Sequence, residues 1–244
     1  MNRMEFWTPD MISFMKDATQ KTAYFSVLAN KVKLLCPEAK TVLDAGCGTG
    51  SLTLELSKLF ECAIGADLSS SAIESLREET IKKNIKNIRA VNCDLLKDGV
   101  EKITGGLKPE VMVFSLFGSV SQAFEISGRL GCPKIVIVKR AYKTHRFSLT
   151  GVPIEYDSSF REELNSLTEN YTEEEFEVEF GQPFRSIEDA VRFFEIYSRD
   201  KDRSVITMEN VEKLLERTEE KEFPFYLRKT RKCLLFSAET GGRR

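Results

Sequence analysis

Several features that would assign the protein to a particular class are scarce or missing from its 244 residues. Six cysteines occur without any Cys-x-x-Cys pair, which is unlike a zinc site or a disulfide framework and fits a reducing compartment. No apolar run reaches the length of a membrane span, and Met1–Glu5 lacks the apolar core of a signal peptide. A formal net charge of -2 provides no basic field to gather nucleic acid. We therefore expect a cytoplasmic protein that has no metal site, does not associate with a membrane and does not bind nucleic acid.

Residues 41–60 predict a strand, a glycine turn and a helix in succession. An apolar run ends at Asp44, glycines alternate with other residues at Gly46, Gly48 and Gly50, and leucines at helical spacing follow. Because glycine has no Cβ, the backbone can turn tightly and a ligand can lie against it. The free N–H groups of the following helix point into the same space. This arrangement predicts a cofactor cradle.

The cradle differs from a dinucleotide site in two details. A dinucleotide site reads G-x-G-x-x-G, whereas this chain reads G-x-G-x-G with Ser51 where the last glycine would stand. Asp44 stands two residues before the first glycine, where a carboxylate repels a pyrophosphate but attracts a sulfonium or ammonium group. Val42-Leu-Asp-Ala-Gly-Cys-Gly-Thr-Gly50 resembles motif I of the class I S-adenosylmethionine-dependent methyltransferases.

The resemblance implies S-adenosylmethionine as the cofactor and assigns contacts to the residues that match the motif. Asp44 would shape the loop and the charge beside the sulfonium, while Gly46 and Gly48 would let the methionine part lie close. Ala45 and Cys47 complete this set, although Cys47 is also explained as a small loop filler, because nothing nearby suggests an activated thiolate. Asp44 could instead be a structural residue that ties down the turn.

Two further acids end predicted strands in the order expected for the same family. Asp67 ends the short run that starts at Ala63, and a carboxylate there can accept both ribose hydroxyls in methyltransferases and dehydrogenases alike. The resemblance implies that Asp67 and Leu68 contact the ribose end, and that Asp94 and Leu95 meet the adenine. A helix-capping acid at Asp67 and a surface-loop acid at Asp94 are the structural alternatives.

Strands and helices alternate through residues 41–140, which predicts a parallel sheet with helices on both faces. Right-handed crossovers place the carboxyl ends of these strands along one edge, where a ligand should bind. The resemblance implies a doubly wound, mostly parallel, seven-stranded α/β sheet, closed by an antiparallel strand near 226–238. The predicted strands are 41–45, 62–66, 88–92, 110–115 and 134–139, and the predicted helices lie near 50–60, 71–84 and 119–129.

We expect one methyltransferase domain over residues 1–244, divided into four parts. A helical cap (1–40) precedes the cofactor-binding core (41–141), a substrate-pocket segment with helices and a strand follows (142–222), and the final strand and tail end the chain (223–244). In the cap, Trp7, Phe14 and Tyr24 could line the pocket, although an apolar stripe at helical spacing is also typical of core. Within the pocket segment we predict a strand over 176–184, a helix from Ser186, a second helix near 207–219, and a solvated helix start at Glu173–Glu175.

The exit of the fourth strand faces the methyl group in relatives, so Ser115 and Leu116 are expected to contact the cofactor. Ser115, Tyr24 and His145 are the candidates for a catalytic role, although we favour the alternative that His145 is a surface residue of a basic loop. Three absences argue against nucleic-acid bases and polyamines as the substrate. The chain has no [Asp/Asn/Ser]-Pro-Pro-aromatic run and no Pro-Cys nucleophile, which enzymes acting on nucleic-acid bases would carry. It also has no carboxylate in Phe114–Ser119 to hold a polyamine.

The leading hypothesis is a methyltransferase that moves a methyl group to a small-molecule acceptor by direct displacement. Since a sulfonium methyl is already activated, a dedicated base is optional, and the protein contributes positioning and desolvation. A protein methyltransferase, a non-catalytic regulator that binds S-adenosylmethionine or S-adenosylhomocysteine, and a nicotinamide-dependent dehydrogenase are the alternatives. The sequence specifies neither the acceptor atom nor the oligomeric state.

Overall fold

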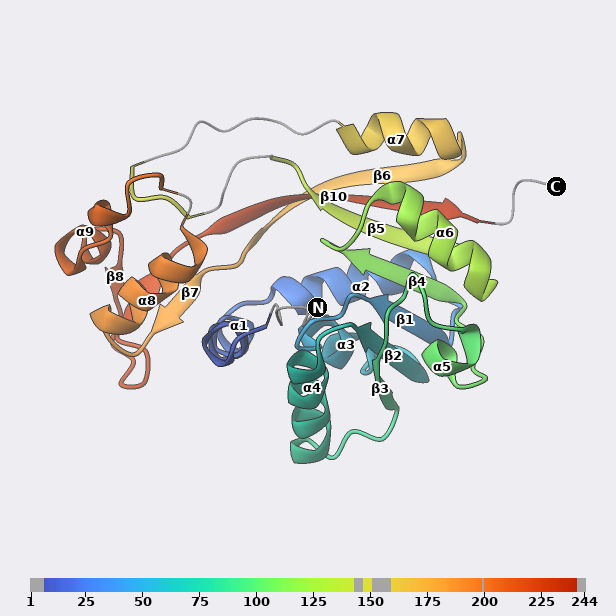
Figure 1. Ribbon diagram of the computed structural model, residues 1–244, viewed down its shortest axis with the longest axis horizontal. Coiled ribbons are helices and arrows are strands. Elements are labelled where there is room, and N and C mark those ends of the chain that lie inside the picture. The colour runs from blue at the N-terminus through green and yellow to red at the C-terminus, as the bar shows by residue number, and fades with distance from the viewer. Residues whose placement is uncertain (1–6, 143–146, 151–158, 199, 241–244) are drawn as a thin grey trace.

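A seven-stranded sheet is the centre of the fold (Figure 1). The computed structural model describes residues 7–142, 147–150, 159–198 and 200–240. The strand order is β3-β2-β1-β4-β5-β10-β6, and β10 alone runs opposite to the other six strands. This confirms the predicted doubly wound, mostly parallel sheet. The strands are β1 (Thr41–Ala45), β2 (Cys62–Asp67), β3 (Ile88–Asn92), β4 (Val111–Ser115), β5 (Lys134–Arg140), β6 (Tyr171–Glu179) and β10 (Thr230–Glu239).

Helices pack on both faces of this sheet (Figure 1). Successive strand residues point to opposite faces, so Val42 packs with α2 and α3 while Leu43 packs with α5, α6 and α7. Helix α4 lies against β2 and β3, and α1 lies against the short strand β7 (Gln182–Phe184). The helices are α1 (Pro9–Lys21), α2 (Tyr24–Leu35), α3 (Ser51–Leu56), α4 (Ser70–Lys82), α5 (Val100–Thr104), α6 (Val120–Leu130) and α7 (Ser159–Leu167).

Hydroxyl caps begin several helices. The side chain of Thr8 accepts a hydrogen bond at the start of α1, with Pro9 in the first turn. Ser69 caps α4 at 3.3 Å, and Ser186 caps α8 (Ile187–Tyr197) at 3.2 Å. Each cap satisfies an N–H group that the first helical turn leaves without a partner. Among the described residues, no helix combines the length and apolar character needed to cross a bilayer.

A small lobe lies beside the main sheet, where helices and a strand after the fifth strand were predicted but a second sheet was not. It contains a second, three-stranded sheet in the order β7-β9-β8, together with α8 and α9 (Met208–Glu212). Strands β6 and β10 extend from the main sheet toward it (Figure 1). Its core is rich in phenylalanine and includes Phe14 from α1. The strands of this second sheet are β7 (Gln182–Phe184), β8 (Glu216–Arg217) and β9 (Phe225–Leu227).

Four local predictions are corrected by the structure. The acidic run Glu173–Glu175 lies in strand β6 and not at a helix start, because its backbone pairs with β10. The strand predicted over 176–184 divides at residues 180–181, so its two halves join different sheets. The helix predicted near 207–219 ends at Glu212, since β8 follows and pairs with β9. Helix α3 is likewise shorter than the 50–60 prediction.

Candidate active site

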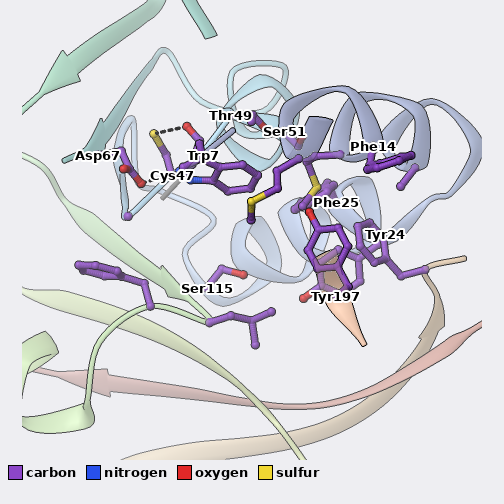
Figure 2. Close-up of a pocket in the computed structure, with 18 of the residues that line it drawn as sticks. Trp7, Phe14, Tyr24, Phe25, Cys47, Thr49, Ser51, Asp67, Ser115 and Tyr197 are labelled. Atoms are coloured by element: carbon purple, nitrogen blue, oxygen red, sulfur yellow. Dashed lines mark hydrogen bonds between the residues drawn. The ribbon is translucent and has the colours of Figure 1, made fainter. Parts of the chain in front are cut away.

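A cavity of about 840 Å³ lies at the carboxyl ends of the parallel strands, beside the small lobe. Its volume falls within the range of about 300–1,000 Å³ that is typical of ligand pockets. Figure 2 shows Asp67 and Cys47 toward one end, Tyr24 and Tyr197 toward the other, and Trp7 between them. The cavity therefore joins the predicted cofactor edge of the sheet to a wall that the small lobe supplies.

The glycine loop, residues 46–50, follows a backbone path that requires glycine. The φ angles of Gly46, Gly48 and Gly50 are +67°, +55° and +80°, in the left-handed region that residues with a Cβ rarely adopt. A Cβ on Gly46 would lie 2.3 Å from the ring of Phe117, and one on Gly48 would lie 2.7 Å from the ring of Trp7. Backbone thus meets two aromatic rings directly along this edge of the cavity.

Asp67, at the end of β2, faces the cavity and braces the glycine loop. Its Oδ2 accepts a hydrogen bond from the N–H of Gly48 at 2.8 Å, and its Oδ1 accepts one from the N–H of Ser69 at 2.8 Å. Each carboxylate oxygen has a second lone pair, so both can still accept a bond from a ligand hydroxyl. Leu68, 53% exposed, lines the cavity beside it. Both residues lie at the predicted edge, and their binding role stays a prediction.

Asp44 lies beneath the loop and does not line the cavity. Its side chain is buried, and its Oδ2 accepts a hydrogen bond from the hydroxyl of Thr53 at 2.7 Å. Burial raises the pKa of Asp44 to about 7, and the Thr53 bond opposes this rise. The neighbouring Ala45 is fully buried. The geometry agrees with a carboxyl that holds the turn, one of the two roles that the sequence allows.

Asp94 and Leu95 lie outside the cavity lining. The Oδ1 of Asp94 accepts the N–H of Leu96 at 3.1 Å, and its carboxylate lies 3.6 Å from the Lys97 ammonium. Leu95 is buried in the core that includes α6. These contacts account for Asp94 as a loop acid, and an adenine contact by either residue stays a prediction.

The exit of β4 lines the cavity with a strained turn. Ser115, Leu116 and Phe117 all border it. Leu116 has a φ of +58°, and its N–H donates to the carbonyl of Val138 at 2.9 Å. A non-glycine residue in this region costs energy, and such residues gather at functional sites. The predicted contact residues Ser115 and Leu116 therefore line the same cavity as the glycine loop, which includes Cys47.

Aromatic side chains line the rest of the cavity, from Trp7 against the glycine loop to the small lobe. Trp7, Phe14 and Tyr24, which the sequence offers as possible lining residues, all border the cavity. From the small lobe, Phe193 lies with its ring centroid 5.3 Å from that of Phe14, and Tyr197 lies 4.6 Å from Phe193. Phe193 and Tyr197 were not among the lining residues predicted from the sequence. Their i, i+4 spacing in a capped amphipathic helix was the available signal.

Two tethers hold the N-terminal segment over the glycine loop. The hydroxyl of Ser71 donates to the carbonyl of Trp7 at 2.9 Å. In α1, the hydroxyl of Thr19 lies 2.9 Å from that of Ser51, which follows the loop and lines the cavity. The predicted helical cap therefore contacts the cofactor edge directly.

Of the other catalytic candidates, Tyr24 is fully buried and His145 lies outside the described residues. The Tyr24 hydroxyl is 3.8 Å from the Sγ of Cys233. Burial raises the pKa of Tyr24, although the Arg231 guanidinium opposes the rise. A phenol with a raised pKa stays protonated at neutral pH and is a hydrogen-bond donor, not a base.

The match to a protein-family model lies in the part of the chain that contains the glycine loop. Residues 42–104 match the family model described as "Methyltransferase domain". A protein named probable cobalt-precorrin-6B C(15)-methyltransferase (decarboxylating), from Methanococcus vannielii, is 40% identical over 53 residues, which are 22% of this chain and 29% of that protein. The 23S rRNA (uracil(1939)-C(5))-methyltransferase of Marinomonas posidonica is 30% identical over 94 residues, 38% of this chain and 20% of that protein. The chain thus spans less than a third of the length of either relative.

The fold itself is shared over a greater length. The crystal structure of the YcgJ protein from Bacillus subtilis matches with a TM-score of 0.52 and 13% sequence identity, covering 88% of this chain and 97% of that one. The segment that matches the family model includes the glycine loop, Asp67 and Asp94. Residues 42–104 therefore match a methyltransferase domain, and the strand order and the glycine loop agree with the class I methyltransferase fold.

Proposed function

We propose that the protein transfers a methyl group from S-adenosylmethionine to a small-molecule acceptor. One observation carries this proposal: a single cavity of about 840 Å³ extends from the glycine loop and Asp67 to an aromatic wall of the small lobe. Donor and acceptor could therefore occupy one cavity beside the β4 exit. We propose that residues 1–244 form a single domain, in which the 142–222 segment supplies most of the small lobe.

The residues at the sheet edge suit the cofactor chemically. Asp67 would accept the ribose hydroxyls, because both of its oxygens keep a free lone pair. Gly46 and Gly48 would let the methionine part approach the backbone. Ser115 and Leu116 would contact the cofactor from the β4 side. Asp44 would act through the loop, since Thr53 and burial already define its position.

When bound, S-adenosylmethionine supplies a methyl group on a sulfonium that needs no further activation. The protein then has to exclude water and align the acceptor, which is where the aromatic wall contributes. Among the described cavity residues, Asp67 is the single carboxylate, and its two oxygens already brace the loop. We therefore propose direct displacement without a dedicated base, with Tyr24 as a fixed donor near the acceptor.

A small acceptor is favoured over RNA or protein by the walls of the cavity. Trp7 and α1 lie over the glycine loop, and Phe193 and Tyr197 contact the same aromatic group. A base or side chain of a macromolecule would have to enter past these rings. The Marinomonas relative, whose name specifies RNA, is similar to only 38% of this chain, and the match to the family model ends at residue 104.

Two measurements test the proposal in sequence. Calorimetry should detect S-adenosylhomocysteine binding to the wild-type protein and no comparable binding of NADH, which would separate it from a dehydrogenase. Methyl-labelled S-adenosylmethionine is then incubated with the protein and a cell extract, and the products are passed through a membrane that retains macromolecules. Label in the filtrate is the expected result. Label retained with RNA or protein, or cofactor binding with no transfer to any fraction, would contradict it.

A further inference from the structure

Two arginines share one face of the main sheet where it borders the cavity. Arg140 ends β5, and its partner across the ladder is Cys233 of β10. Arg231 precedes Cys233 by two residues, so it points to the same face. Such diagonal neighbours have their Cα atoms about 7–8 Å apart, within reach of long side chains. Both arginines line the cavity.

No carboxylate of the described residues forms an ion pair with either guanidinium. The nearby glutamates of β6 alternate to the other face, where Glu175 pairs with Lys232 at 2.6 Å. Glu179 is held by Arg228 at 3.2 Å. On the cavity face, Arg231 lies opposite the apolar Val178. The strand register thus separates the two cations from the acids beside them.

Aromatic rings surround Arg231. Arg231 is only 9% exposed, and its guanidinium lies 4.6 Å from the ring centroid of Tyr24 and 4.1 Å from that of Phe180. The Nε of Arg140 is buried and has no hydrogen-bond partner among the residues that the structure describes. Burial lowers the pKa of Arg140, and the charge of Arg231 lowers it further. Two like charges in an apolar wall are costly unless an anion compensates them.

A helix end adds to the same field. Tyr24 and Phe25, the first residues of α2, also line the cavity. This helix begins without a side-chain cap and has no acid in its first turn. The N-terminus of a helix carries a partial positive charge that favours anions. Three sources of positive potential therefore meet at this end of the cavity.

We propose that the methyl acceptor carries an anionic group, a carboxylate or a phosphate, which Arg140 and Arg231 bind. This inference rests on the proposed function and names its substrate class. Three strand spacings separate β5 from β2, where Asp67 braces the glycine loop, which corresponds to about 14 Å. The anion site thus lies at the acceptor end. Arginine suits this role because its planar fork matches both carboxylate and phosphate.

The test uses the protein saturated with S-adenosylhomocysteine and three pairs of aromatic probes. Benzoate, phenylacetate and phenyl phosphate are each compared with an uncharged partner: benzamide, phenylacetamide and phenol. Calorimetry measures affinity, and the fluorescence of Trp7, the one tryptophan of the chain, reports entry into the cavity. At least one anion should bind about tenfold more tightly than its partner, equivalent to about 1.4 kcal/mol.

Variants identify the residues responsible. Arg140→Gln and Arg231→Gln should each abolish the preference for the anion and leave the affinity for S-adenosylhomocysteine unchanged. Arg231→Lys should retain part of the preference. Arg228→Gln, which removes a surface arginine held by Glu179 and Glu216, is the matched control and should change nothing. Circular dichroism checks that each variant folds. If the Arg231 variants do not fold, the anion preference of Arg140→Gln alone tests the inference.

Two results would overturn the inference. One is that no anion binds more tightly than its uncharged partner. The other is that Arg140→Gln or Arg231→Gln weakens S-adenosylhomocysteine binding, because the pair would then serve the carboxylate of the cofactor. If the wild-type protein binds no S-adenosylhomocysteine, the proposed function fails, and the same probe pairs on the protein alone still measure whether the arginines bind an anion.

Discussion

The buried carboxyl of Asp44 should make the stability of the protein fall as the pH rises toward neutrality. Burial raises the pKa of Asp44 from 3.8 to about 7, and Thr53 opposes this only in part. Between these two values the folded chain keeps a proton that the unfolded chain has released, so the free energy of unfolding decreases with pH. Since one pKa unit corresponds to about 1.36 kcal/mol, the loss between pH 5 and pH 8 amounts to about 3 kcal/mol.

The substitution Asp44→Asn isolates this effect, because an amide oxygen can still accept the Thr53 hydroxyl but does not titrate. Urea unfolding followed by circular dichroism at pH 5 and pH 8 should show that the wild type loses about 3 kcal/mol relative to the variant. Thr53→Val is the control: it removes the bond that lowers the pKa of Asp44, so the loss should shift to higher pH. Equal pH dependence of the wild type and Asp44→Asn would refute the reasoning.

Three further predictions concern the loop, the cavity edge and the small lobe. Asp67→Ala should weaken S-adenosylhomocysteine binding about tenfold or more in calorimetry, through lost charge-assisted hydrogen bonds, and unchanged affinity would exclude the ribose assignment. Gly46→Ala should destabilise the fold by about 1–3 kcal/mol in urea titrations, because its φ is +67° and its Cβ would meet Phe117; an unaltered midpoint would contradict this. Hydrogen bonds from Ser148, Thr150 and other groups hold the pKa of Asp200 well below 3.8. Its stabilisation is therefore present above about pH 4 and lost as the pH falls. Asp200→Asn should lose stability at pH 7 and show a weaker acid dependence in thermal melts, and an identical profile would count against this role.

The cofactor edge could be predicted from sequence because its signals are local. The glycine loop, Asp67 and the strand pattern of 41–140 each occupy a few consecutive residues, and a parallel sheet places their carboxyl ends together. The structure adds what local pattern does not contain. Asp44 points into the protein and not into the cavity, which depends on Thr53 nine residues later.

The acceptor side could not be predicted in this way, because its geometry depends on distant pairing. The second sheet joins residues 182–184 to 225–227, and the shared face of Arg140 and Arg231 follows from the β5–β10 register. Neither strand pairing can be recognised from the periodicity of a single segment of the sequence. The run Glu173–Glu175 shows the same limit, since its charges indicated a solvated helix start while pairing with β10 made it a strand.

The position of β6 also bears on how the protein behaves at high concentration. β6 is an edge strand of the main sheet, and such an edge exposes backbone groups that can recruit a strand from another molecule. Five of its nine residues are glutamates, and several are held by cations from α2, α7 and β10. A second copy that paired with this edge would have to displace or bury these charged groups, so the acids that suggested a helix shield the sheet from self-association and aggregation.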